Sequence, residues 1–129
     1  MINETDMEAW EYYNEVYKNK TMNLNDYQKM AARTAIYKTT HAILYPALGL
    51  AGEAGEVANK IKKMLRDDDF DRAGIAAEIG DVLWYWVQGC MALGFTPEEV
   101  MTENIKKLEK RYPNGFEVAR SETREVGDI

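Results

Sequence analysis

Four carboxylates in two short motifs are the residues of this sequence best suited to chemistry. Glu53 and Glu56 are three residues apart, and so are Glu78 and Asp81. This spacing places both members of a pair on one face of a helix. Each pair is flanked by apolar or small residues, where a carboxylate without a partner would be costly. The pattern therefore predicts that the four acids act together.

A hard divalent cation is the partner that would stabilise such a group of acids. Neighbouring carboxylates repel one another and resist ionisation unless a positive charge compensates them. Mg²⁺ prefers oxygen ligands and keeps several waters, and Mn²⁺ is the alternative. Glycine costs roughly 1 kcal/mol in a helix relative to alanine, so the three beside these acids, at 52, 55 and 80, indicate close approach of backbone, metal or ligand. We predict a metal site with the ligands Glu53, Glu56, Glu78 and Asp81.

A solvated helix face and a diiron site are the two alternatives to a magnesium site. The acids of a solvated helix face would form ion pairs such as Glu56 with Lys60, four residues on. Two pairs on consecutive helices, each in apolar surroundings, favour a metal site over this alternative. A diiron bundle would need Glu-x-x-His pairs, but His41 is the only histidine.

Helices are the elements that must position these acids, and helical signals dominate the chain. Asn23 or Asn25 caps a helix that begins near residue 26, and Asp71 caps another over 72–93. Thr96, followed by proline and then Glu99, forms a capping box that opens a helix over 97–111. Apolar periodicity predicts two more helices, over about 4–18 and 47–65.

These elements predict an all-α protein whose core is an antiparallel four-helix bundle, with an extra N-terminal helix and a polar C-terminal tail. The chain has 129 residues, enough for one domain with a continuous core. We divide it into an N-terminal helical arm at 1–24, a domain at 25–116, and a C-terminal tail at 117–129. We expect the tail to be an arm or to be partly disordered.

Charge and composition exclude several classes of partner. The net charge of −6 argues against a broad grip on nucleic acid or on an anionic membrane surface. The most apolar stretch, 82–93, is far shorter than the roughly 20 residues that a membrane-spanning helix needs. The N-terminus has no secretory signal pattern, and the single cysteine, Cys90, cannot form an internal disulfide. We therefore expect a cytoplasmic protein that binds neither nucleic acid nor membranes.

Three sequence blocks resemble the MazG-like nucleotide pyrophosphohydrolases. They are GLAGEAGEV at 49–57, EIGDVLWY at 78–85 and NIKKLEKRYP at 104–113. The first two contain Glu-x-x-Glu and Glu-x-x-Asp, separated by 21 residues. The three blocks occur in the family's order on predicted helices, and the resemblance covers about residues 25–116.

This resemblance implies an Mg²⁺-dependent enzyme that hydrolyses a nucleoside triphosphate to a monophosphate and pyrophosphate. It implies a homodimer or homotetramer, and it implies that the four acids are the catalytic metal ligands, without choosing the general base among them. Asn104, Lys107 and Arg111 share a helix face and resemble the family's phosphate-contacting positions. Lys63 and Lys60 are weaker phosphate-binding candidates. Candidates for stacking on the base are Tyr37, Trp84, Tyr85 and Trp86.

The sequence leaves the substrate open. Related enzymes on the same fold act on dUTP, dCTP or phosphoribosyl-ATP, and the motifs do not separate these substrates. A further alternative is a helical oligomerisation module that binds nucleotide without hydrolysing it.

Overall fold

The computed structural model describes residues 20–124 together with Glu11, Asn14, Lys18, Val126 and Gly127. Every regular element among them is helical, which confirms the all-α prediction. The helix predicted over 4–18 lies largely outside the described residues. The α-helices are α2 (Leu24–Ala31), α3 (Leu44–Asp67), α4 (Arg72–Ala92), α5 (Pro97–Arg111) and α6 (Val118–Glu122), and two short 3-10 turns, η1 (Ala32–Thr34) and η2 (Thr39–His41), lie between α2 and α3.

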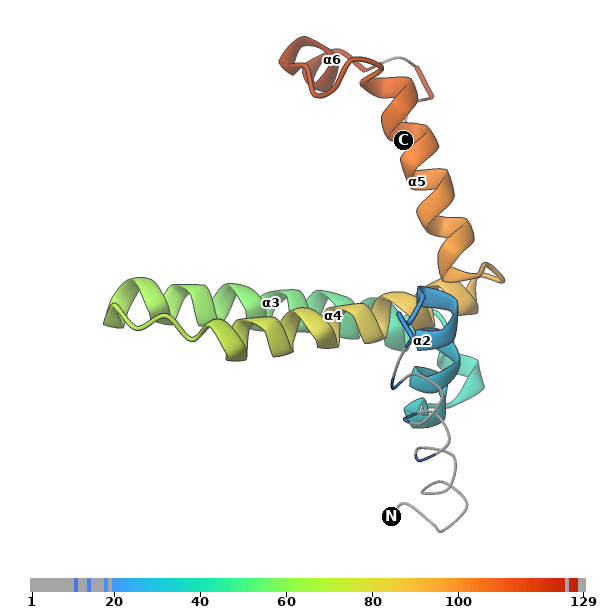
Figure 1. Ribbon diagram of the computed structural model, residues 1–129, viewed down its shortest axis with the longest axis vertical. Coiled ribbons are helices and arrows are strands. Elements are labelled where there is room, and N and C mark those ends of the chain that lie inside the picture. The colour runs from blue at the N-terminus through green and yellow to red at the C-terminus, as the bar shows by residue number, and fades with distance from the viewer. Residues whose placement is uncertain (1–10, 12–13, 15–17, 19, 125, 128–129) are drawn as a thin grey trace.

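A long antiparallel hairpin of α3 and α4 dominates the molecule (Figure 1). Helix α2 packs near the C-terminal end of α4, and α5 begins at that same end and then turns away from the hairpin. The short helix α6 follows beyond the far end of α5. The four principal helices that the sequence predicts are thus α2 to α5, and the hairpin is the pair that packs along its length.

Local hydrogen bonds explain why three of these helices begin where they do. The side-chain oxygen of Asn23 accepts a bond from the Asp26 N–H at 2.8 Å, which caps α2. At α5, Thr96 Oγ1 accepts from the Glu99 N–H at 3.2 Å, and Glu99 Oε2 accepts from the Thr96 N–H at 2.8 Å. This reciprocal pair is the predicted capping box. Asp71 caps α4 as predicted.

The observed helix boundaries differ from the predicted ones by up to three residues. Helix α3 begins at Leu44, three residues before the predicted start, because the preceding turn continues into the helix without a capping side chain. Pro46 lies in its first turn and is buried there. The tail contains the short helix α6, whose five residues give too short a periodic pattern to recognise in the sequence.

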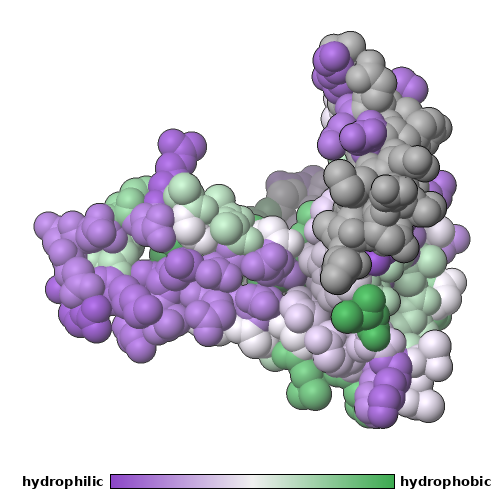
Figure 2. Space-filling view, turned by 90° about the horizontal axis from the view of Figure 1, so that it is seen from below, coloured by the Kyte–Doolittle hydropathy of each residue, from purple (hydrophilic) through white to green (hydrophobic). Residues whose placement is uncertain are grey.

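The hairpin helices approach closely where Gly49 of α3 meets the Tyr85 ring of α4. A Cβ atom at Gly49 would overlap with that ring. The most deeply buried residues, Val87 and Cys90 of α4 with Pro46 and Pro97, lie at the end of the hairpin where α2 and α5 join it. The surface at the opposite end of the hairpin is mostly hydrophilic (Figure 2), although Leu65 and Phe70 are exposed there. No helix in the described part of the chain is both long and apolar enough to cross a membrane.

Helix α5 keeps an uncovered apolar face. Met101, Ile105 and Leu108 are 44%, 55% and 38% exposed, although they share one side of the helix. The hairpin does not cover this face, because α5 diverges from it. An amphipathic helix normally buries its apolar side against a partner.

Candidate metal centre

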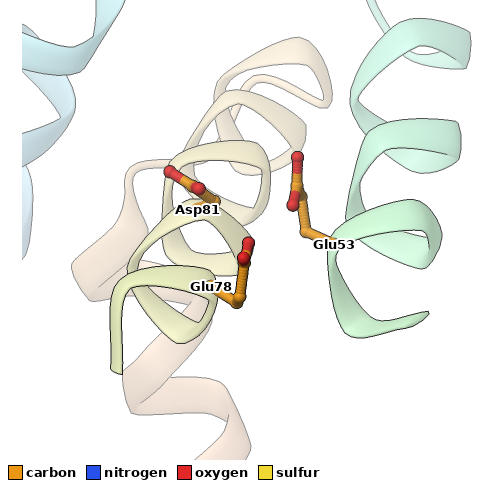
Figure 3. Close-up of side chains that lie close together, drawn as sticks. All are labelled: Glu53, Glu78 and Asp81. Carbon is orange, nitrogen blue, oxygen red and sulfur yellow. The ribbon is translucent and has the colours of Figure 1, made fainter. Parts of the chain in front are cut away.

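Three of the four predicted acids converge between the two hairpin helices. Glu53 extends from α3, while Glu78 and Asp81 extend from one face of α4 (Figure 3). One carboxylate oxygen from each lies within 4.8 Å of those from the other two. The antiparallel packing of α3 on α4 therefore brings together residues 25 positions apart in the chain. We call Glu53, Glu78 and Asp81 the carboxylate cluster.

Burial and charge act together on the carboxylate cluster. Glu53 and Glu78 are half-buried, whereas Asp81 is exposed. Partial burial raises the pKa of Glu53 above its ordinary value of 4.5, and the negative charges of Asp81, Glu78 and Glu56 raise it further. Glu53 therefore resists ionisation unless a positive charge joins the carboxylate cluster.

Glu56 stands apart from the carboxylate cluster. It is exposed on α3, one turn after Glu53, and its oxygens are not among the three that meet within 4.8 Å. Its charge nevertheless contributes to the raised pKa of Glu53. Glu56 thus lies beside the cluster.

The donor set of the carboxylate cluster fits a hard divalent cation. All three donors are carboxylate oxygens, which Mg²⁺, Ca²⁺ and Mn²⁺ prefer over the nitrogen and sulfur ligands typical of zinc. The exposure of Asp81 leaves one side open, as Mg²⁺ requires because it retains several waters. The chemistry of these side chains supports divalent-metal binding in general and does not select one metal.

A pocket of about 470 Å³ adjoins the carboxylate cluster. Its walls combine Glu53 and Asp81 with Thr34, Tyr45, Trp84 and Tyr85. Trp84 Nε1 donates a hydrogen bond to Thr34 Oγ1 at 2.9 Å, which fixes the indole plane. Tyr45 stacks on Tyr37, with ring centroids 4.5 Å apart.

Sequence reasoning missed Thr34 and Tyr45 as parts of this pocket. Thr34 ends a 3-10 turn, and Tyr45 lies in the first turn of α3. Neither position carries a spacing signal that links it to the acids. Only the packing of η1 and of the first turn of α3 against α4 brings them to the pocket. Of the four aromatic residues proposed for base stacking, Trp84 and Tyr85 line it.

The predicted phosphate-binding residues lie in other places. Asn104 and Lys107 line a different pocket, together with Phe95 and Glu103. The Arg111 guanidinium lies 5.9 Å from the centre of the Tyr112 ring near the end of α5. These three residues share α5 as predicted, but none of them lines the pocket beside the carboxylate cluster.

Two lysines of α3 lie in a third pocket, near the loop that joins α3 to α4. Lys63 and Lys60 line it together with Asp67, Asp69 and Asp71. Lys60 is within ion-pair distance of Glu78, a member of the carboxylate cluster, and of Asp71. The structure thus places Lys60 against Glu78 rather than Glu56, the residue that the solvated-face alternative paired with it.

The glycines beside the acids have open space around them. A Cβ atom at Gly52, Gly55 or Gly80 would meet no atom within 4 Å. The close approach of backbone that these glycines indicated is therefore not found among the described residues. It occurs instead at Gly49, one turn before Gly52.

Comparison with known proteins identifies the family. The family model described as the MazG nucleotide pyrophosphohydrolase domain matches residues 40–116. The chain belongs to the MazG family. It is also 39% identical over 105 residues to the "Gene 37 protein" of Mycobacterium phage L5, with 73% of this chain and 92% of the phage protein covered. No solved structure matches it significantly.

Membership of the MazG family confirms the resemblance found in the motifs, and it gives the chain a nucleotide substrate and a hydrolase function at a coarse level. The MazG match contains the whole hairpin and α5. It therefore includes the carboxylate cluster as well as Asn104, Lys107 and Arg111. Thr34, at the edge of the nearby pocket, precedes the matched segment.

Proposed function

We propose that this protein is an Mg²⁺-dependent enzyme that hydrolyses a nucleoside triphosphate between the α- and β-phosphates, giving a nucleoside monophosphate and pyrophosphate. One observation carries the proposal: three carboxylates from two packed helices converge within 4.8 Å at the edge of a pocket lined by aromatic side chains. The domain at 25–116 would carry the activity, in a cytoplasmic protein that binds neither nucleic acid nor membranes.

The acids have distinct parts in this proposal. Glu53, Glu78 and Asp81 hold Mg²⁺, or Mn²⁺ in its place, and Glu56 joins them from its position one turn after Glu53. A divalent cation bound there would neutralise phosphate oxygens and assist the attack of a water in line with the leaving group. Because the pKa of Glu53 is raised without metal, Glu53 would be stabilised in its charged form by this compensation.

The pocket beside the carboxylate cluster is where we place the nucleoside. An aromatic ring there offers a flat surface for a base, and the hydrogen bond from Trp84 to Thr34 keeps one ring in a fixed orientation. The pocket volume of about 470 Å³ lies in the range of small-molecule sites. Its open shape next to two acids suits a ligand whose phosphates extend toward the metal.

The α5 helix of a second chain would supply the phosphate-binding residues. Lys63 of α3 is a weaker candidate for binding phosphate. Asn104, Lys107 and Arg111 lie on α5, which diverges from the hairpin and does not reach the carboxylate cluster of its own chain. The uncovered apolar face of α5 provides a surface for association. A second surface is an apolar pocket of about 260 Å³ lined by Leu50, Trp86, Leu93 and their neighbours. Both surfaces support a homodimer or homotetramer.

The test is a panel of standard and damaged nucleoside triphosphates assayed for pyrophosphate release, with Mg²⁺ and with a chelator. We expect pyrophosphate from at least one nucleotide in the presence of Mg²⁺ and none with the chelator. The panel includes dUTP, dCTP and phosphoribosyl-ATP, because enzymes on this fold act on each of them.

Two outcomes would contradict the proposal. Release of orthophosphate alone would place the cleavage at the terminal phosphate. Thermal stabilisation by nucleotides without turnover of any of them would favour the non-catalytic oligomerisation module.

A further inference from the structure

Lys60 lies between the carboxylate cluster and the start of α4. Its Nζ is 3.6 Å from Glu78 Oε1 and also 3.6 Å from Asp71 Oδ2. Lys60 and Glu78 have side chains that are 30% and 21% exposed, so this ion pair is partly shielded from water. Among the ion pairs found in the described part of the chain, only this one involves a member of the carboxylate cluster.

Asp71 is the second acid that contacts the Lys60 ammonium group. One of its carboxylate oxygens, Oδ1, accepts the hydrogen bond from the Gly74 N–H at 2.9 Å that caps α4. The other oxygen, Oδ2, therefore points toward Lys60. Gly74 permits this arrangement, because a Cβ atom there would overlap with the Asp71 carboxylate. The helix cap and the lysine thus share one carboxylate.

The ammonium group and a bound metal would act on the same negative charge. Three carboxylate oxygens within 4.8 Å repel one another, and Lys60 supplies a positive charge at one of them. A divalent cation in the carboxylate cluster would provide the same compensation and would be repelled by the nearby ammonium group. The metal and Lys60 therefore compete for Glu78.

We propose that Lys60 is the counter-ion of the metal-free carboxylate cluster, and that its competition with the metal for Glu78 lowers the metal affinity of the site. Asp71 receives the ammonium group when a metal occupies Glu78, since the lysine already lies at equal distances from both acids. The three acids can then lie close together before a metal binds, and a bound metal can dissociate readily. This inference rests on the proposed function only through the assignment of the cluster as the metal site.

The experiment measures Mn²⁺ binding by electron paramagnetic resonance in the full chain at low ionic strength. Lys60→Met is compared with Lys60→Arg, which keeps the charge, and with Lys62→Met, which removes one positive charge from the exposed side of the same helix. We expect Lys60→Met to bind Mn²⁺ about threefold to tenfold more tightly than wild type, since a partly exposed charge pair has a modest effect. We expect Lys60→Arg and Lys62→Met to stay within about twofold of wild type.

A second readout is thermal unfolding with a chelator and with Mn²⁺. Without metal, Lys60→Met should unfold at a lower temperature than wild type, because the acids lose their counter-ion. Mn²⁺ should then raise its Tm by more than it raises that of wild type. Lys60→Gln serves in place of Lys60→Met if the methionine variant does not fold.

Asp71→Asn tests the ion pair between Lys60 and its second acidic partner. Asparagine caps helices as well as aspartate does, so α4 should keep its start, while Lys60 loses one of its two acidic partners. The ammonium group should then bind Glu78 more closely, and Mn²⁺ affinity should fall by about threefold to fivefold, which is more than the change expected of the two control variants.

The counter-ion role would be overturned if Lys60→Met bound Mn²⁺ as tightly as wild type or more weakly. If Lys60 only oriented Glu78 toward the metal, its removal would weaken Mn²⁺ binding. Tighter binding by Lys62→Met to the same degree would also overturn it, since net charge alone would then explain the change. No saturable Mn²⁺ binding by wild type would instead overturn the metal site itself, and this role of Lys60 with it.

Discussion

The α3–α4 hairpin and helix α5 carry the two groups of residues that the sequence assigns to catalysis, and they present them differently. In the hairpin, two helices pack along their length, and Glu53 meets Glu78 and Asp81 across the contact. On α5, Asn104 and Lys107 lie on a helix that diverges from the hairpin and exposes apolar side chains. One region brings its functional groups together within the chain, and the other does not.

This difference separates the metal-binding residues from the residues that we propose bind phosphate. The hairpin has the residues for a divalent cation, and it has its own compensating charge in Lys60. Helix α5 has donors for phosphate oxygens but no acid of the carboxylate cluster near them. A single chain would therefore bind metal, whereas turnover on our proposal would require the α5 of a second chain.

The largest expected effect comes from neutralising the hairpin site. Asp81→Asn keeps the shape of the side chain but removes one of three charges from the carboxylate cluster. We expect kcat to fall by roughly 10²–10³-fold or more, as on loss of a group that stabilises developing charge. Pyrophosphate release measures the change, and far-ultraviolet circular dichroism should show unchanged helix. Glu109→Gln, an exposed acid of α5, is the matched control and should retain activity.

A smaller effect should follow from removing one phosphate donor on α5. We expect Lys107→Ala to lower kcat/KM by about 10–100-fold, since a charged hydrogen bond contributes roughly 1.5–3 kcal/mol. Mixing this variant with Asp81→Asn should restore about a quarter of wild-type activity, because random dimers would contain one intact site in every four. If both residue groups acted within a single chain, mixing would restore nothing.

The packing of the two regions predicts a difference in stability. Gly49→Ala forces a Cβ against the Tyr85 ring, so we expect a loss of about 1–3 kcal/mol in the free energy of unfolding. Thr96→Ala removes the cap of α5 and should cost about 1 kcal/mol. Urea unfolding measures both changes.

Gly52→Ala is the matched control for the hairpin. It lies on the same helix with nothing within 4 Å of the new Cβ, so it should stabilise the protein by about 0.5–1 kcal/mol. Destabilisation by Gly52→Ala would mean that a partner chain or a ligand fills the space beside it.

The smallest expected effect concerns the charge of Glu53 without metal. The pKa of Glu53 is raised in the folded state, so between 4.5 and the raised value the folded chain binds more protons than the unfolded chain. Its contribution to stability is therefore present below pH 4.5 and is lost as the pH rises through the folded pKa. With a chelator at neutral pH, Glu53→Gln should raise Tm slightly, and the difference should vanish in acid. A constant difference at every pH would contradict this origin.

Much of the fold was predictable because its signals are local. The caps at Asn23, Asp71 and Thr96 each join a side chain to a backbone N–H three residues away, so the sequence shows them directly. The i,i+3 spacing likewise placed Glu78 and Asp81 on one face of α4, as found. The start of α3 and the helix α6 were not predicted, because neither has a capping side chain.

By itself, the sequence determined the helices, the residue types of the candidate site and, through its motifs, the family, because each depends on neighbours within a few positions. Only the tertiary structure decided which acids meet, that Glu56 stands beside the carboxylate cluster, that Lys60 turns to Glu78 and Asp71, and that α5 leaves the hairpin. These outcomes depend on how α3 packs against α4, where contacts join residues far apart in the chain, and no local spacing encodes that geometry.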